Sequence, residues 1–323
     1  MIPDFRTKDE ECELLFELEA SDTGPLHLGR LLGGTNGGRL VVLRHVEAGL
    51  IQACVRSVNA SRGIAHPRLG KVLGFVGVGG QRYIASEYME GCTLAELVQV
   101  ATANGGSIEP AVASRIVLDA LQAVIAGRKL LVSRDAAPEG RCFHADAVWI
   151  AEFGETFLLE IGILHHLGRT PPNPELEDLD GEDGDVMSAG AALLELLGGI
   201  PGELERVTAR ALAPNRADSY DGPEAMVSAL SDLPRELLAT ETKVSESVKR
   251  LLGQSFERRK LKLDMLRRDW VATFADLENE STQFYQTAEL TPARNEDTVR
   301  PPAPARPEAA SGAPAQKLSL IHI

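Results

Sequence analysis

The sequence is poor in several features that would define a protein class directly. It has only four cysteines (Cys12, Cys54, Cys92 and Cys142) and no Cys-x-x-Cys pair, which argues against a zinc ribbon or a disulfide scaffold and fits a reducing cytoplasm. Lys and Arg total 33 against 47 Asp and Glu, a net charge of −14, so a nucleic-acid partner is not expected. We expect no membrane span in this portion, because no run of about 18 apolar residues occurs. The charged N-terminus, with no apolar stretch behind it, predicts no signal peptide.

The residues that are present suit one two-lobed domain followed by a tail. The chain has 323 residues, and 44% of them are apolar, enough for a sizeable core. Apolar runs bounded by turn residues predict strands, and apolar residues spaced three and four apart predict helices. The predicted strands are 14–18, 26–32, 40–46, 72–78, 82–88, 147–151 and 156–160. The predicted helices are 50–58, 94–101, 110–127, 185–197, 203–212 and 222–233. Strands followed by helices with one embedded hairpin indicate an α+β fold.

The composition divides the chain into four parts. We expect a small β-rich N-lobe at 12–88, a larger helical C-lobe at 89–234, a long amphipathic helix at 235–285 and a disordered Pro/Ala-rich linker at 286–323. A basic stretch at 258–268 on the long helix is interpreted as a solvated face. The last six residues, 318–323, do not fit the linker and match translated sequencing-adapter read-through. We therefore expect the natural protein to continue past residue 317, where a membrane segment would remain compatible with the pattern.

Several motifs follow one another in a recognisable order. The segment Ser86–Gly91, here called the hinge, reads S-E-Y-M-E-G, and His66-Pro67 precedes it. Asp185–Gly190 reads D-V-M-S-A-G. Asn173-Pro174-Glu175 and the run 210–218 complete the series. Over residues 12–233 these motifs and their spacing resemble the eukaryotic-like serine/threonine protein kinases of bacteria.

The resemblance implies a two-lobed kinase fold and gives roles to individual residues. In the hinge, the carbonyl of Glu87 and the amide of Met89 would face an adenine. Asp185 would accept hydrogen bonds from backbone amides of the catalytic loop. Glu175 would normally pair with an arginine late in the C-lobe, but Ser219 stands at that arginine position. We therefore expect the usual ion pair to be absent and no peptide-docking platform to form.

The positions that handle phosphate depart from the family pattern. The strand lysine is replaced by Arg44, which is a planar fork and not a point charge. Its helix partner should be a Glu near Ser57, yet no acidic residue lies between residues 48 and 64. Only Gly24 remains of the glycine-rich loop. The metal-binding D-F-G triplet becomes Glu160-Ile161-Gly162, one methylene longer at the carboxylate.

The catalytic loop admits two alignments. In the first, Cys142 replaces the catalytic Asp and Ala147 replaces the metal-binding Asn, and the loop runs into the following strand without a gap. In the second, Asp135 keeps the catalytic Asp and Gly140 stands at the Asn, at the cost of extra residues before the strand. We favour the first, and both lose the Asn.

Altogether the sequence predicts a pseudokinase, a catalytically impaired kinase-like domain that acts as a protein-interaction or regulatory module in bacterial signalling. No catalytic residue, metal site or cofactor is expected, and Mg-ATP would bind weakly through Gly24, Arg44, Glu87, Met89 and Glu160. Its partner would be a protein that contacts the helical lobe or the long helix. One alternative is a slow or atypical kinase that uses Arg44, Asp135 and Glu160. Another is a sensor that binds ATP without transferring phosphate.

Overall fold

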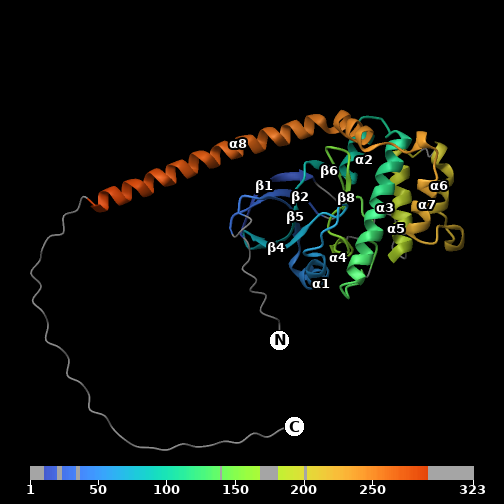
Figure 1. The fold of residues 1–323 in the computed structure, drawn as a ribbon, viewed down its shortest axis with the longest axis horizontal. Coiled ribbons are helices and arrows are strands. Elements are labelled where there is room, and N and C mark those ends of the chain that lie inside the picture. Colours follow the sequence, from blue (N-terminus) through green and yellow to red (C-terminus); the bar gives the residue numbers. More distant parts are fainter. Residues whose placement is uncertain are drawn as a thin grey trace, which may run out of the picture. The chain divides into compact units, whose positions relative to one another are not determined.

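The structure is a computed structural model, and it describes residues 11–19, 24–33, 37–138, 140–167, 181–199 and 202–289, with side chains as far as Arg268. The chain divides into two compact units, Met1–Lys262 and Leu263–Ile323, and each is described by itself. Figure 1 shows the sheet and helices of the first unit.

The N-lobe is a five-stranded antiparallel sheet with one helix. The strands are β1 (Cys12–Glu19), β2 (Leu26–Leu31), β3 (Leu40–Val46), β4 (Val72–Val78) and β5 (Gln81–Glu87). Their order across the sheet is β1-β2-β3-β5-β4. Helix α1 (Ile51–Ser61) buries Cys54, Val58 and Ser61, which share one face at helical spacing. The predicted strands and helix of this lobe are all present, with shifts of a few residues at their ends.

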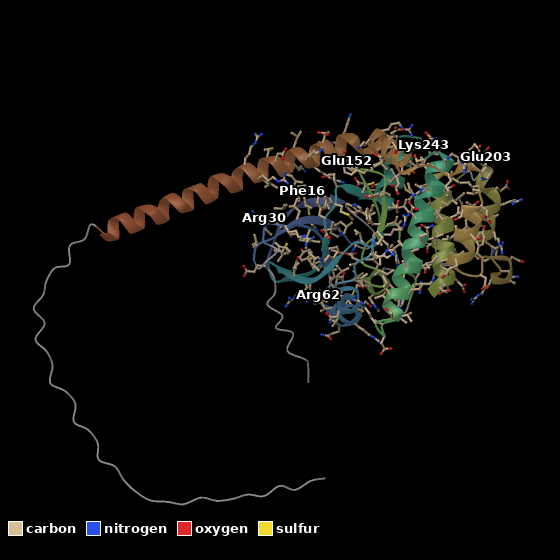
Figure 2. The ribbon with its side chains drawn as sticks, viewed as in Figure 1. Phe16, Arg30, Arg62, Glu152, Glu203 and Lys243 are labelled. Atoms are coloured by element: carbon tan, nitrogen blue, oxygen red, sulfur yellow. The ribbon has the colours of Figure 1, made fainter. Side chains whose placement is uncertain are left out.

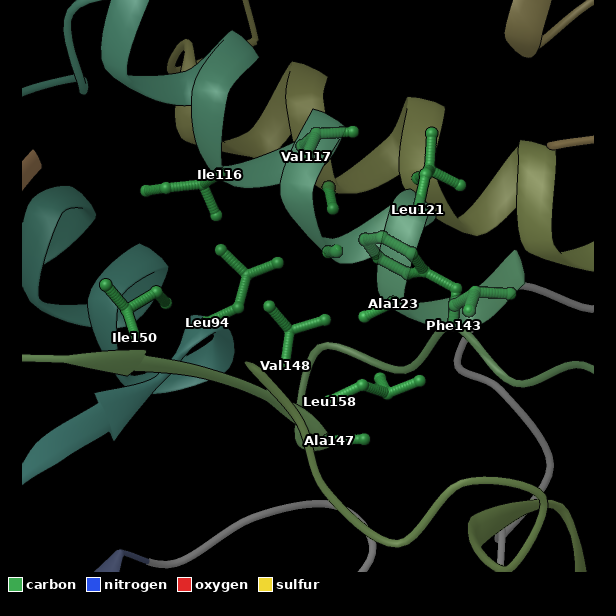
Figure 3. Packing of buried hydrophobic residues seen from close by; sticks show 14 of the residues in the cluster. Leu94, Ile116, Val117, Leu121, Ala123, Phe143, Ala147, Val148, Ile150 and Leu158 are labelled. Atoms are coloured by element: carbon green, nitrogen blue, oxygen red, sulfur yellow. The ribbon is translucent and has the colours of Figure 1, made fainter. Parts of the chain in front are cut away.

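The C-lobe is built around one long apolar helix. That helix is α3 (Pro110–Val132), with Pro110 in its first turn, and it continues past the predicted end at residue 127. The surrounding helices are α2 (Leu94–Ala103), α4 (Leu164–Leu167), α5 (Gly181–Leu196), α6 (Glu205–Ala211) and α7 (Pro223–Ser231). Figure 3 shows how Ile116, Val117 and Leu121 of α3 pack against Phe143 and Val148. Such dense packing leaves α3 with little exposed surface.

A small sheet joins the two lobes. It consists of β6 (Gly91–Thr93), β7 (Val148–Ala151) and β8 (Thr156–Leu158), paired antiparallel in that order. The sequence did not predict β6 or α4, because each spans fewer residues than a pattern needs to show its period. Since β6 follows the hinge directly, its pairing with β7 fixes the hinge against the C-lobe.

Helix α3 is long and apolar enough to cross a membrane by length and composition alone. However, 72% of its apolar window is buried by surrounding elements, as in the core helix of a globular domain. Its burial among α5, α7 and β8 accounts for this composition without a lipid environment.

The long helix α8 runs over Glu241–Glu289 and not over the predicted 235–285. Residues Arg235–Leu237 form a separate 3-10 turn, and Thr240 caps the start of α8 by accepting a hydrogen bond from the amide of Lys243 at 3.3 Å. The cap sets the later start. The predicted linker therefore begins no earlier than residue 290, and 290–323 lie outside the described residues.

Candidate functional site

An ion pair fills the position where a kinase handles phosphate. Nε of Arg44 donates to Oε2 of Glu160 at 2.5 Å, and both side chains are 0% exposed. A second guanidinium nitrogen of Arg44 donates to the carbonyl of Asp146 at 3.1 Å. Glu160 adopts a left-handed backbone with φ of 51°, a conformation that a non-glycine residue rarely takes. The structure thus brings together Arg44 and Glu160, which the sequence presented as two separate losses.

Local structure explains why Arg44 takes this partner. Arg44 lies in β3 between Leu26 of β2 and Ile84 of β5, so its backbone position is fixed by the centre of the sheet. Helix α1, which should supply a carboxylate, contains no acidic residue. Ser61 donates to the carbonyl of Ile161 at 3.0 Å, and Ser57 contacts Nε2 of His166 at 3.0 Å. The buried guanidinium consequently takes its negative charge from Glu160.

The thiol of Cys54 in α1 is buried near the carboxylate of Glu160. Burial, together with the nearby Glu160 carboxylate, raises the pKa of this thiol to about 11. The thiol therefore stays neutral and cannot compete with Glu160 for the arginine. Cys54 is 0% exposed.

The space beside the hinge is filled by an apolar cluster. Its members come from both lobes and are almost inaccessible to solvent. They are Leu26 (0% exposed), Val42 (1%), Trp149 (2%) and Leu159 (1%). Tyr88 and Met89 of the hinge pack against this cluster, and the rings of Tyr88 and Trp149 meet edge to face at 6.4 Å. The four side chains are therefore closed to solvent in this structure.

Trp149 owes its place to strand pairing and to one glycine. It lies in β7, where it pairs with Thr93 of β6. A Cβ added to Gly91 would come within 2.6 Å of Nε1 of Trp149, so residue 91 must be glycine for the indole to fit. Among the described residues Nε1 has no hydrogen-bond partner. The indole is thus held by packing alone.

The catalytic-loop segment 140–147 is held by Asp185, as the sequence predicted. Oδ1 of Asp185 accepts hydrogen bonds from the amides of Cys142 and Phe143 at 2.5 and 2.7 Å. Its other oxygen, Oδ2, pairs with Arg128 at 2.7 Å. Asp185 is 0% exposed, and burial raises its pKa although these donors counteract the effect. Both oxygens of this carboxylate therefore make contacts, which hold the segment 140–147 and Arg128 to α5.

The two candidate positions for a catalytic base differ sharply in location. Cys142 is 2% exposed, and burial raises the pKa of its thiol to about 12, so it is no nucleophile at neutral pH. Asp135 lies in the exposed turn after α3 with φ of 56°, and its carbonyl accepts from Arg56 at 3.0 Å. The loop whose Asp146 carbonyl contacts Arg44 is 140–147, not the turn of Asp135. Burial also lowers the pKa of His144 to about 3, which keeps that imidazole neutral.

Helix α8 fastens the two lobes together near the hinge. The guanidinium of Arg259 donates to the carbonyl of Gly91 at 2.8 Å, to the carbonyl of Leu18 in β1 at 3.2 Å and to Glu96 of α2 at 2.6 Å. Arg259 is 7% exposed, so the interpretation of the basic stretch as fully solvated is wrong for this residue, although Arg258 and Lys260 are exposed as expected.

Other contacts extend this attachment along the first part of α8. Ser245 donates to the carbonyl of Glu152 at 2.6 Å, and the ammonium of Lys262 lies 5.2 Å from the ring centre of Phe16. Figure 2 labels Lys243 near the start of α8, and Glu152 and then Phe16, which belong to other elements, further along the helix. The helix therefore contacts both the C-lobe and β1 of the N-lobe, which opposes any opening at the hinge.

The other residues to which the sequence assigned a role lie at separate places in the structure. Gly24 has φ of +103°, which favours glycine. The side chain of Glu87 pairs with Arg39 and is turned away from the apolar cluster. Glu175 lies outside the described residues, so its missing partner stays a prediction. Arg216, three residues before Ser219 in the chain, is 76% exposed and pairs with Asp183 at 2.8 Å. The two adjacent histidines, 165 and 166, belong to α4.

Taken together, these features define the class of the fold. The protein has the protein-kinase fold, with a β-rich N-lobe, a helical C-lobe and a long C-terminal helix. Crystal structures of the PknI kinase domain from Mycobacterium tuberculosis are similar to it. One mutant form matches 68% of this chain and 94% of that chain, at 19% identity with a TM-score of 0.52, and a double mutant gives the same values. No family model matches the sequence, and neither does any curated protein.

Sequence reasoning missed Trp149 and Arg259. A signal for Trp149 was present, because a tryptophan two residues after the catalytic-loop Asn position stands in a strand that borders the hinge. Arg259 carried no such signal, since one arginine among many on a helix looks solvated until its neighbours are known.

Proposed function

We propose that this protein is a pseudokinase: a kinase-fold domain that does not transfer phosphate and acts as an interaction or regulatory module in signalling. The observation that carries the proposal is the burial of Trp149 in the cluster beside the hinge. An adenine ring would have to displace an indole that already occupies its place. Expelling a tryptophan from a packed core costs several kcal/mol, which is comparable to the whole affinity of a millimolar ligand, about 4 kcal/mol.

The charged residues support the same proposal at the phosphate end. A kinase needs a free positive charge for the phosphates and a free carboxylate for the metal. Here Arg44 and Glu160 neutralise each other at 2.5 Å in a site that excludes solvent. If a nucleotide separated the two side chains, each charge would need a new partner in the low-dielectric interior. The residues present therefore do not fit Mg-ATP in this arrangement.

The side chains of the catalytic-loop segment also support the proposal. Segment 140–147, held by Asp185, offers a neutral thiol at Cys142, a neutral imidazole at His144 and the methyl group of Ala147. None of these is an oxygen ligand of the kind that Mg²⁺ requires, and none is a base of the required strength. The chain keeps the kinase fold, but this segment lacks the side chains that phosphate transfer needs.

A regulatory role fits a kinase body fixed in one shape. Arg259 joins β1, β6 and α2 from within α8, so the lobes are tied at the hinge. A body without a nucleotide cycle presents constant surfaces, which suits an interaction module. The first part of α8 belongs to this body, so a partner that contacts α8 would be positioned relative to both lobes.

The test is phosphate transfer by the full chain. Incubation with γ-labelled Mg-ATP, alone and with generic protein substrates, is expected to give no labelled product above background, while an active bacterial kinase assayed alongside gives strong labelling. A parallel reaction with Glu160→Gln guards against a contaminating kinase. Labelling that is present in the wild type and lost in Glu160→Gln would overturn the proposal and favour a slow kinase.

A further inference from the structure

The first part of α8 is held on the C-lobe by an extensive set of contacts. Four of its apolar side chains are buried in the main core cluster: Val244, Val248, Leu252 and Phe256. Ser245 donates to the carbonyl of Glu152 at 2.6 Å, and Lys243 pairs with Glu109 at 2.8 Å. Burial of several large apolar side chains makes this attachment difficult to detach. Residues 241–256 are here called the anchor.

The N-lobe is reached at the other end of this part of the helix, through Arg259. Its guanidinium donates to the carbonyl of Leu18 in β1 at 3.2 Å. The same group donates to the carbonyl of Gly91 at 2.8 Å and to Glu96 of α2 at 2.6 Å. Arg259, here called the latch, thus joins both lobes through a few polar contacts. Hydrogen bonds of this kind exchange for water at a much lower cost than the buried anchor does.

The latch holds the backbone on both sides of the cluster that contains Trp149. The side chain of Leu18 packs against this cluster. Gly91 lies against the indole, since a Cβ added there would come within 2.6 Å of Nε1 of Trp149. The buried members of the cluster come from both lobes, two from each: Leu26, Val42, Trp149 and Leu159. The cluster therefore stays closed as long as the latch keeps these two stretches of backbone together.

Other contacts hold the lobes together on the side of α1. Ser61 donates to the carbonyl of Ile161 at 3.0 Å, and Arg44 pairs with Glu160 at 2.5 Å. These residues belong to the kinase body itself, whereas the latch belongs to a helix that follows it. Loss of the latch is therefore expected to loosen the lobes on the side of the hinge and to leave the Arg44–Glu160 pair in place.

We propose that Arg259 is a releasable latch that regulates access to the space beside the hinge. While it is engaged, the cluster around Trp149 is closed. When it is released, a planar heteroaromatic ring such as adenine enters between the indole and the apolar side chains of the N-lobe. Arg259 lies one helical turn before the first unit ends at Lys262, so a partner that bends α8 beyond that residue acts on the latch before the anchor. The inference rests on the proposed function, because it describes how the closed site of the pseudokinase is regulated.

The first test is acrylamide quenching of Trp149 in the full chain. The chain has two tryptophans, so Trp270→Phe leaves Trp149 as the single emitter. Adding Arg259→Ala should raise the quenching constant about threefold or more, because the released cluster opens to solvent. The matched control is Arg258→Ala. Arg258 is exposed and donates to the carbonyl of Gln254 in its own helix at 3.2 Å, so its loss should leave the quenching unchanged.

The second test uses adenosine as the probe, because it has no phosphate and makes no demand on the Arg44–Glu160 pair. In equilibrium dialysis with labelled adenosine, Arg259→Ala should bind about tenfold more tightly than the wild type or Arg258→Ala, since its open form is more populated. Glu96→Gln weakens the latch without changing α8. It should shift both readouts in the same direction by less, and it carries the test if Arg259→Ala does not fold.

Three results would overturn the latch: unchanged quenching in the latch variants, an equal change in Arg258→Ala, or adenosine binding no tighter than in the wild type. Transfer of labelled phosphate from Mg-ATP by Arg259→Ala would instead overturn the pseudokinase proposal and support the latch. The two proposals can therefore fail separately.

Discussion

Replacing Arg44 with alanine is expected to lower the free energy of unfolding by about 3–5 kcal/mol, one of the largest effects of any single substitution in this protein. The reason is the carboxylate that is left behind. Glu160 is 0% exposed, and its Oε2 takes its hydrogen bond from Arg44, so removing the arginine strands a buried charge. Denaturant unfolding followed by circular dichroism measures the change.

Two controls separate the buried pair from charge in general. Lys129 and Glu224 form an ion pair at 3.3 Å whose side chains are 70% and 55% exposed, so Lys129→Ala should cost less than about 1 kcal/mol. The double variant Arg44→Met with Glu160→Leu removes both charges and keeps much of the volume, and it should recover most of the loss. If Arg44→Ala costs no more than Lys129→Ala, the two side chains are not paired in the interior.

Trp149→Ala is expected to cost about 3–5 kcal/mol, because it empties the centre of the cluster beside the hinge. Trp149 is among the largest fully buried side chains, and its neighbours Leu26, Val42 and Leu159 cannot all collapse into the space because two of them are fixed in the N-lobe sheet.

 The measurement is again denaturant unfolding, with the midpoint and the slope recorded separately.

The matched control for Trp149 is a neighbouring aromatic on the surface. Phe153 lies in the turn between β7 and β8, is 71% exposed, and should lose no more than about 0.5 kcal/mol on replacement by alanine. A loss for Trp149→Ala as small as that for Phe153→Ala would mean that the indole does not occupy the core beside the hinge, and the proposed occlusion would have to be abandoned.

The sequence was sufficient for the architecture and for the structural motifs. The order of strands and helices follows from local patterns, because turn residues and apolar periodicity have a short-range signal. The hinge and the role of Asp185 were implied by the resemblance to the bacterial serine/threonine kinases. The resemblance implied that Asp185 accepts hydrogen bonds from the catalytic-loop backbone, and in the structure the donors are the amides of Cys142 and Phe143.

The site itself could be predicted only in part. Arg44 and Glu160 were each recognised as departures from a kinase, yet their pairing joins residues 116 positions apart and depends on how two lobes close. Arg259 shows the same limit, since its partners Leu18, Gly91 and Glu96 lie more than 160 residues away in the chain. Helical periodicity predicts which face of a helix is apolar, but not which single charged side chain will be buried against another element.

The boundaries of α8 illustrate a smaller discrepancy. The apolar pattern suggested a start near residue 235, and the Thr240 cap sets it at Glu241. Capping depends on one side chain and one amide, so it is easily overlooked in a pattern that averages over several turns.

The most direct test of the central claim is a melting experiment on the wild-type full chain with millimolar Mg-ATP. A ligand at 100 times its dissociation constant stabilises a protein by about 2.7 kcal/mol, which would raise the melting temperature by several degrees. Since Trp149 fills the space beside the hinge and Arg44 is paired with Glu160, we predict no shift with Mg-ATP, Mg-ADP or ATP alone. A reproducible rise of several degrees with Mg-ATP would contradict the account and show that the pocket opens to nucleotide.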